Sequence, residues 1–193
     1  MNLIRNPLTW LRRIRHRRGH GIHSPFAYNL VTQVLYNPGT YYAYALLDRL
    51  QPRHVQLLHL RPRAVHRLLF RLANYRQPQH IAAPGLTPTE WNCLHEGCRH
   101  AVIDTAMPAT PPDMLLLRPH SPEASDNSPS LTDDWHRHIN DNTLLVVLDL
   151  PRNRALWQSV RSHPRTRITL DLADLGIAFF LPRLNRQHYI INW

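Results

Sequence analysis

Hydrophobic residues along the chain alternate between short unbroken runs and helical spacing. Val55, Leu57, Leu58 and Leu60 form an apolar run between two prolines, which predicts a buried strand within 53–60. The leucines that follow recur every three or four positions, which predicts an amphipathic helix. A strand, a tight loop and a helix make up the opening unit of a doubly wound α/β sheet. Such sheets bind ligands at the carboxyl ends of their strands.

The alternation continues to the end of the chain. Short apolar runs predict further strands at 80–85, 100–105, 113–118 and 143–150. Helical spacing predicts helices at about 87–96 and 151–162, with a weaker candidate at 131–139. Three consecutive β runs follow, at 167–172, 176–181 and 188–193. Strands that alternate with helices and then follow one another predict a mostly parallel sheet with antiparallel C-terminal strands.

Two helices are predicted ahead of this sheet. Ser24 and Pro25 supply an N-cap and a proline at the first helical position, and Asn37-Pro38-Gly39 ends that helix. A second helix is expected at about 41–50, with side chains available for burial at Tyr41, Tyr44, Ala45, Leu47 and Leu50. We therefore expect a basic arm at 1–18, a helical cover at 19–52 and an α/β domain at 53–193.

Charge adds a class of partner to this picture. The chain of 193 residues has a formal net charge of +10, and every one of its basic residues other than histidine is arginine. A basic surface favours polyanions or anionic membranes. The arm at 1–18 is either an amphipathic basic helix for such a partner or a solvated segment that packs back on the domain.

Compartment and metal chemistry follow from the cysteines. Two cysteines and no apolar run near the roughly 20 residues of a membrane span fit a cytoplasmic protein without a disulfide framework. Cys93, His95, Cys98 and His100 are zinc-ligand types close in sequence, but their spacing is not that of a C-x₂-C pair. The sequence therefore predicts no metal site.

Both ends of the chain carry the pattern of a known family. Gly21, His23, Ser24, Pro25 and Phe26 form a G-x-HSPF motif before a tyrosine-rich helix. The closing segment has LDL at 148–150, a helix with Trp157, ITLDLADLGIAFF at 168–180 and a final HYIINW. In these motifs the chain resembles the bacterial class I S-adenosylmethionine-dependent methyltransferases, in particular an O-methyltransferase-like group. The resemblance implies a Rossmann-like α/β fold and S-adenosylmethionine as cofactor.

Within that resemblance, the cofactor-binding positions carry unexpected residues. The family's glycine-rich loop aligns with His59, Leu60, Arg61, Pro62 and Arg63. Glycine serves there because it lets the backbone turn sharply and approach the ligand. The acid that would hold the ribose hydroxyls aligns with Ala83 and Pro84, whose side chains cannot accept a hydrogen bond.

Two candidate catalytic residues and a group of pocket candidates remain. His120 and Asp149 match the family's catalytic positions, but one carboxylate and one imidazole make a poor Mg²⁺ site. His20, His23, Ser24 and Phe26 either line a pocket or form a loop packed by its own turn chemistry.

The losses at one site favour a pseudoenzyme over an active O-methyltransferase, which stays open as a residual activity. The alternative is a non-catalytic module that binds nucleic acid or a phosphorylated ligand. Arg61, Arg63 and Arg118 follow neighbouring predicted strands and suit phosphate or carboxylate, unless they are ordinary surface arginines. A third hypothesis is a protein-interaction scaffold whose site has decayed. The oligomeric state stays open.

Overall fold

The computed structural model describes residues 21–49, 62–107, 109–118 and 134–193. The chain forms two compact units. The helical unit is drawn from Met1–Gln77, Pro88–Arg99 and Ile190–Trp193, and the sheet unit from Pro78–Thr87 and His100–Tyr189. Strands and helices alternate along the chain, so the fold is α/β and Rossmann-like, as the sequence predicts.

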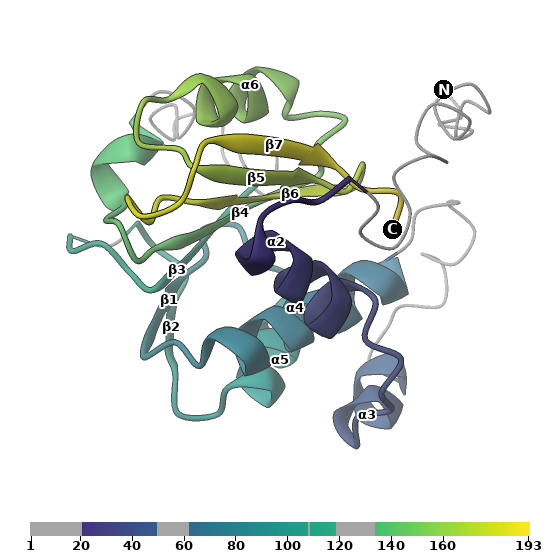
Figure 1. The fold of residues 1–193 in the computed structure, drawn as a ribbon. Coiled ribbons are helices and arrows are strands. Elements are labelled where there is room, and N and C mark those ends of the chain that lie inside the picture. The colour runs from purple at the N-terminus through teal and green to yellow at the C-terminus, as the bar shows by residue number, and fades with distance from the viewer. Residues whose placement is uncertain (1–20, 50–61, 108, 119–133) are drawn as a thin grey trace. The chain divides into compact units, whose positions relative to one another are not determined.

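In the described ranges, the sheet has seven strands in the order β2-β1-β3-β4-β6-β5-β7 (Figure 1). Their bounds are β1 His80–Ala82, β2 Val102–Asp104, β3 Met114–Leu117, β4 Leu144–Leu148, β5 Ile168–Asp171, β6 Leu175–Phe179 and β7 Gln187–Ile190. The pairs β1–β2, β1–β3 and β3–β4 are parallel. The pairs β4–β6 and β5–β6 are antiparallel. The predicted parallel sheet with antiparallel C-terminal strands is therefore confirmed.

The direct pairing of β1 with β3 is the feature that matters most for function. Ile81 lies opposite Met114, and Ala82 lies opposite Leu115. In the doubly wound order 3-2-1-4, the first strand separates the second from the fourth. If the predicted strand at 53–60 is counted as the first strand of this order, β1 is the second strand and β3 is the fourth. In the structure these two strands are direct neighbours. The residues of that predicted strand lie outside the described part of the chain.

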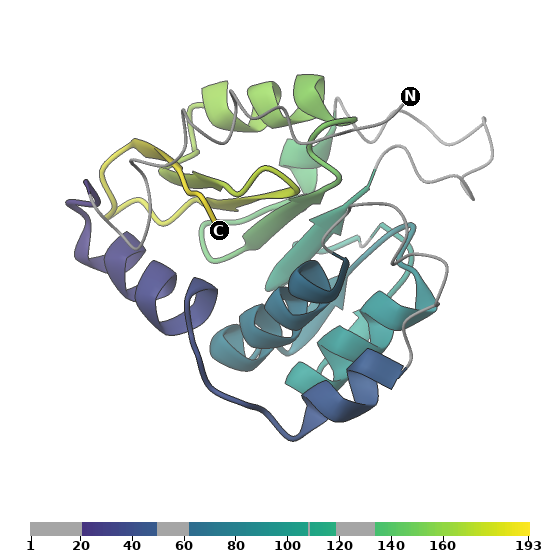
Figure 2. The same ribbon diagram turned by 90° about the vertical axis from the view of Figure 1, so that its right-hand side faces the viewer.

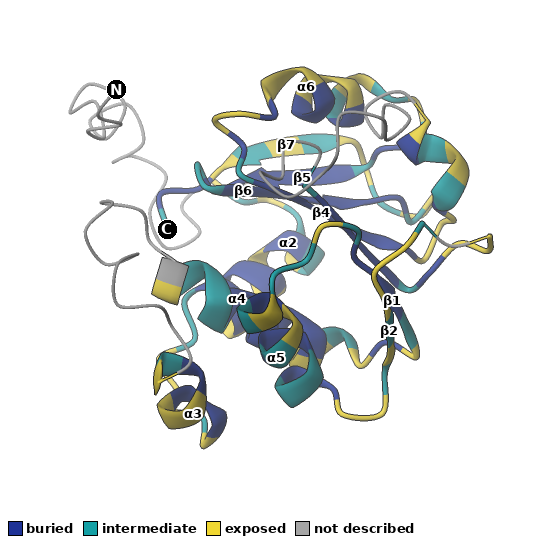
Figure 3. Ribbon diagram, turned by 180° about the vertical axis from the view of Figure 1, so that it is seen from behind, coloured by how far each residue is buried: buried dark blue, intermediate teal, exposed yellow. Residues whose placement is uncertain are grey.

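One face of the sheet packs on α6 (Arg154–Ser162) and on the 3₁₀ turn η4 (Trp135–His138). All five residues of β4 are buried, which explains its unbroken apolar run (Figure 3). The cluster on this face takes alternate residues of the central strands, as the two-residue period of a strand requires. Its larger members are Leu115, Leu117, Trp135, Leu145, Val147, Leu156, Trp157, Val160 and Phe180.

The helical unit consists of α2 (Pro25–Leu30), the π-helical η2 (Val31–Leu35), α3 (Ala43–Arg49), α4 (Pro62–Arg76) and α5 (Pro88–Gly97). In Figure 2, α3 lies beside α4 and α5. A Cβ on Gly97 would overlap the carbonyl oxygen of Phe70, so the close approach of α5 to α4 requires glycine there. The chain end returns to this unit, where Trp193 Nε1 donates to the Leu35 carbonyl at 3.0 Å.

Local signals placed most of these helices correctly. Ser24 Oγ accepts a hydrogen bond from the backbone N–H of Ala27 at 3.3 Å, so the predicted N-cap is confirmed. The predicted buried face of α3 is partly wrong, because Ala45 is exposed and Ala43 is buried instead. Arg71 on α4 is only 8% exposed. It donates to the Val34 and Leu35 carbonyls at 2.6 and 3.2 Å and to the hydroxyl of Tyr44 at 3.0 Å.

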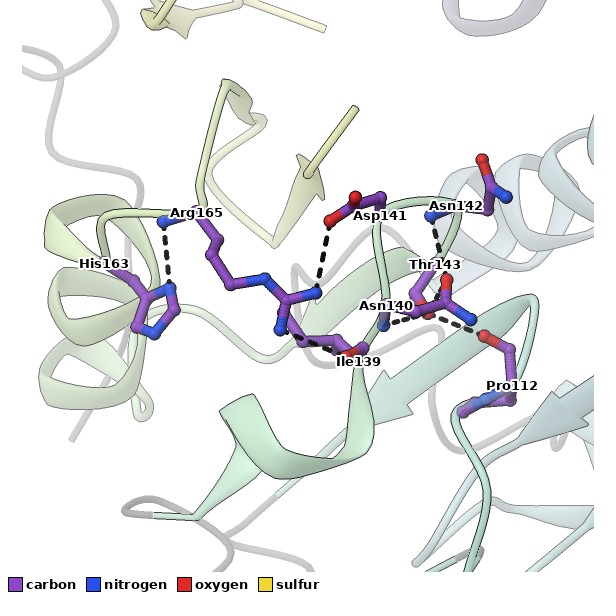
Figure 4. Close-up of polar contacts among 8 residues, drawn as sticks. All are labelled: Pro112, Ile139, Asn140, Asp141, Asn142, Thr143, His163 and Arg165. Atoms are coloured by element: carbon purple, nitrogen blue, oxygen red, sulfur yellow. Dashed lines mark hydrogen bonds and ion pairs between the residues drawn. The ribbon is translucent and has the colours of Figure 1, made fainter. Parts of the chain in front are cut away.

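At the amino ends of the strands, a polar network ties loops together (Figure 4). Thr143 Oγ1, just before β4, donates to the Pro112 carbonyl at 2.8 Å and accepts from the backbone N–H of Asn140 at 3.0 Å. Arg165 reaches the Ile139 carbonyl and the Asp141 carboxylate, both at 3.3 Å. These polar groups satisfy one another's hydrogen bonds. In doubly wound sheets, ligands bind at the opposite, carboxyl ends of the strands.

Candidate functional site at the carboxyl ends of the strands

The order in which strands are added to the sheet reverses between β1 and β3, because the chain places β2 on one side of β1 and β3 on the other. Ligands of doubly wound sheets bind beyond the carboxyl ends of the strands at such a switch point. Here those ends are Ala83–Pro84 after β1, Arg118 after β3 and Asp149 after β4. These four of the predicted site residues therefore end adjacent strands of one sheet edge.

The end of β1 offers a ligand almost no polar side chain. Ala82 and Ala83 are fully buried, and the N–H of Ala83 donates to the Asp104 carbonyl at 2.8 Å. Pro84 has no N–H to donate. The carboxylate of Asp104, which is paired with Ala82 across β1 and β2, lies 2.7 Å from Nε2 of His80. The alanines cannot hold ribose hydroxyls, and Asp104 already has a partner within the sheet.

The end of β4 is a tight polar turn. Asp149 has a φ of 52°, in the left-handed region that aspartate tolerates better than most residues. The side-chain amide of Asn153 donates to the Leu148 and Asp149 carbonyls at 2.9 and 3.2 Å. Arg152 Nη1 lies 3.3 Å from Asp149 Oδ2. The amide fixes the backbone of the turn, while the carboxylate of Asp149 lies beside a positive charge.

A second carboxylate lies at the end of β5. Asp171 is 8% exposed, and its Oδ1 accepts from the backbone N–H of Ala173 at 3.0 Å. Arg154 Nη1 lies 4.0 Å from Asp171 Oδ2. Ala173 has a φ of 74°, which is unusual for a residue with a Cβ. The hairpin from β5 to β6 is therefore built on an aspartate turn and a strained alanine.

Two buried polar atoms in the first turns of α6 are unsatisfied. Among the residues that the structure describes, Asn153 Oδ1 and Trp157 Nε1 have no hydrogen-bond partner. Buried polar atoms are normally paired, often by an ordered water. Sequence reasoning missed Asn153, because nothing in its spacing shows that its amide would cap a strand.

Several predicted site residues belong to the helical unit instead. Ser24 serves as the helix cap described above, Phe26 is half-buried and His23 is exposed. Arg63 lies in the first turn of α4 and not in a loop, since the helix begins at Pro62. His20, His59, Leu60, Arg61 and His120 lie outside the described residues.

Arg63, one of the three arginines predicted to bind an anion, is paired within its own unit. Arg63 Nε donates to Asp48 Oδ1 at 3.0 Å, and its Nη2 contacts Oδ2. Arg67 Nη2 donates to the same Oδ2 at 2.7 Å. Partial burial alone would raise the pKa of Asp48, but the hydrogen bonds from these arginines hold it below its ordinary value. The carboxylate of Asp48 occupies the anion-binding face of Arg63.

The cysteines add no reactive group. Cys93 and Cys98 are free and buried. Burial, followed by the charges of Glu90 and Asp48, raises the pKa of the Cys93 thiol to about 12, so it stays protonated at neutral pH. No three histidine, cysteine, aspartate or glutamate side chains in the described ranges are placed to share a metal ion. In the same ranges, no helix combines the length and the apolar character of a membrane span.

No protein-family model matches the chain, and no curated protein matches it either.

Proposed function

We propose that this protein is a methyltransferase-like pseudoenzyme, which keeps the α/β scaffold without transferring methyl groups. The direct pairing of β1 with β3 carries the proposal. In a doubly wound sheet the first strand and its glycine-rich loop lie between these two strands and hold the cofactor. With β1 and β3 hydrogen-bonded to each other, that central position is closed in the described sheet.

The side chains at the switch point support the same conclusion. A nucleoside cofactor needs a carboxylate for its ribose hydroxyls, and β1 ends in buried alanines followed by Pro84. The carboxylates nearest to it, Asp104 and Asp149, each lie beside a basic side chain of the same unit. Methyl transfer depends on positioning the cofactor, and these groups do not provide the contacts that would do so.

Isothermal titration of the full chain with S-adenosylmethionine tests the proposal, with S-adenosylhomocysteine in parallel and circular dichroism to verify folding. We expect no saturable heat at millimolar ligand. One-to-one binding of either compound would overturn the proposal. If Asp149→Asn then weakened that binding while Asp141→Asn did not, the cofactor would be held at the end of β4.

The second candidate function is binding of an anionic partner, and the charge of the chain favours it. The net charge is +10. In the described part of the helical unit, six arginines stand against three acidic residues. We expect affinity for a polyanion such as heparin to fall steeply between about 50 and 200 mM salt, since counterion release drives such binding. Affinity independent of salt would remove this candidate.

A further inference from the structure

The helical unit exposes aromatic rings on adjoining helices, where a packed helix pair normally exposes charged side chains. Tyr42, just before α3, is 72% exposed, and Trp91 on α5 is 38% exposed. Leu46, one helical turn after Tyr42, is 48% exposed. Together with His95 and Arg99 on or just after α5, these residues are called the aromatic platform below.

Two ring contacts join members of the platform in pairs. The Trp91 and His95 rings stack with centroids 4.8 Å apart and planes at 30°. The guanidinium carbon of Arg99 lies 5.8 Å from the centroid of the Tyr42 ring. The helices that carry these pairs, α3 and α5, pack beside each other (Figure 2).

On α3, the exposed Leu46 lies away from the buried residues that pack this helix into the unit. Ala43, Tyr44 and Leu47 are buried, and their rings and methyls provide the packing of α3. Figure 3 shows exposed and buried residues on opposite sides of this helix. Packing of the unit therefore does not account for the rings of Tyr42 and Trp91, and truncating them should leave the fold intact.

The charge around the platform indicates what kind of partner it fits. Arg99 is 63% exposed, and it is held in place by Glu96, whose Oε2 lies 2.8 Å from Nη2. The arginine excess of the unit repels a second copy of the same basic chain. Exposed rings that alternate with cations match single-stranded nucleic acid, whose bases stack on aromatic side chains while its phosphates contact arginines.

We infer that the aromatic platform binds single-stranded nucleic acid, with bases on Tyr42 and on the Trp91–His95 stack, while the arginine excess of the helical unit attracts its phosphates. This inference deepens the second candidate function and is independent of the pseudoenzyme proposal. A double helix presents its bases edge-on within grooves and would leave the rings without stacking partners. The platform therefore distinguishes single strands from duplexes.

The test is fluorescence anisotropy of the full chain with labelled oligothymidylate, compared with a duplex of the same length. We expect tighter binding of the single strand. Tyr42→Leu and Trp91→Leu should each weaken it by about fivefold or more, because stacking of one base contributes roughly 1–3 kcal/mol. Tyr42→Phe should bind like wild type, since it keeps the ring. Tyr75→Leu is the matched control, because Tyr75 is 47% exposed on α4 outside the platform.

Binding of heparin, a polyanion without bases, distinguishes base stacking on the platform from attraction by the positive charge of the chain. The double variant Tyr42→Leu/Trp91→Leu should keep wild-type heparin affinity while losing the oligonucleotide. If that variant binds oligothymidylate as tightly as wild type, the platform is not the site and the inference is wrong. Equal affinity for duplex and single strand would overturn it as well.

Discussion

Gly176→Ala is the substitution whose effect the structure defines most sharply. Gly176 lies on β6, and a Cβ built there would be 2.5, 2.6 and 2.7 Å from Cζ3, Cη2 and Cε3 of Trp157. Carbon atoms pack at about 3.5–4.0 Å, so the methyl group would be about 1 Å too close to three ring atoms. Trp157 is 3% exposed within the cluster between α6 and the sheet, so the ring has little room to move.

The expected loss is that of an overpacked core, about 1–3 kcal/mol of unfolding free energy. For a chain of this size each kcal/mol lowers the melting temperature by roughly 2–4 °C. Trp157→Leu removes the colliding ring and leaves a cavity that is destabilising by itself. In that background the methyl group of Gly176→Ala has space, so the second substitution should be close to neutral.

Urea denaturation of wild type, both single variants and the double variant, followed by far-UV circular dichroism, completes the cycle. We expect a coupling of at least about 0.5 kcal/mol between the two sites, since they are in direct contact. The reasoning fails if Gly176→Ala lies within about 0.5 kcal/mol of wild type. It fails equally if the substitution is as harmful in the Trp157→Leu background, since the indole would then not be the cause.

Three further predictions concern other parts of the chain. Ala173→Gly should raise the melting temperature, because φ is 74° and a left-handed conformation costs a residue with a Cβ roughly 1–2 kcal/mol. An unchanged melting temperature would show that the hairpin is unstrained. Arg71→Met should lower the unfolding free energy by about 1–3 kcal/mol or more, because buried carbonyls and the Tyr44 hydroxyl lose their donor. Urea denaturation measures this loss, and an unchanged unfolding free energy would contradict the prediction. Burial, and then the charges of His136 and nearby arginines, lower the pKa of His163 in the folded protein below 6.5. The contribution of this residue to stability is therefore present above pH 6.5, and it is lost as the pH falls through the folded-state pKa. His163→Gln should therefore flatten the fall in melting temperature on acidification, and an unchanged pH profile would refute it.

Elements with strong local signals were predictable from the sequence. The unbroken apolar run at 143–150 becomes β4, whose five residues are all buried. Leucines at helical spacing become the buried face of α4, and Ser24 with Pro25 marks the start of α2. In each case neighbouring residues in the sequence contain the full physical reason, whether burial on both faces, a 3.6-residue period or a capping hydroxyl.

Features that depend on distant residues were not predictable. The helix predicted from Pro151 begins at Arg154, because residues 149–153 form a turn that the Asn153 amide ties to the end of β4. Arg63 was expected at a ligand site, and only the fold brings Asp48 to it. Likewise, apolar patterning predicts strands but does not specify their partners, so the neighbours of β1 had to come from the structure.

The pairing of β1 with β3 also connects the two functional proposals. Under the pseudoenzyme proposal, the pairing of β1 with β3 leaves no nucleoside site at the central position, so the chain would bind its partner through another surface. The sheet edge beyond β4 offers two carboxylates, each beside an arginine, and that arrangement gives no net attraction for an anion. The helical unit, by contrast, combines an arginine excess with exposed rings at Tyr42 and Trp91. A nucleic acid that binds this chain is therefore expected to contact the platform at α3 and α5 and not the carboxyl ends of the strands.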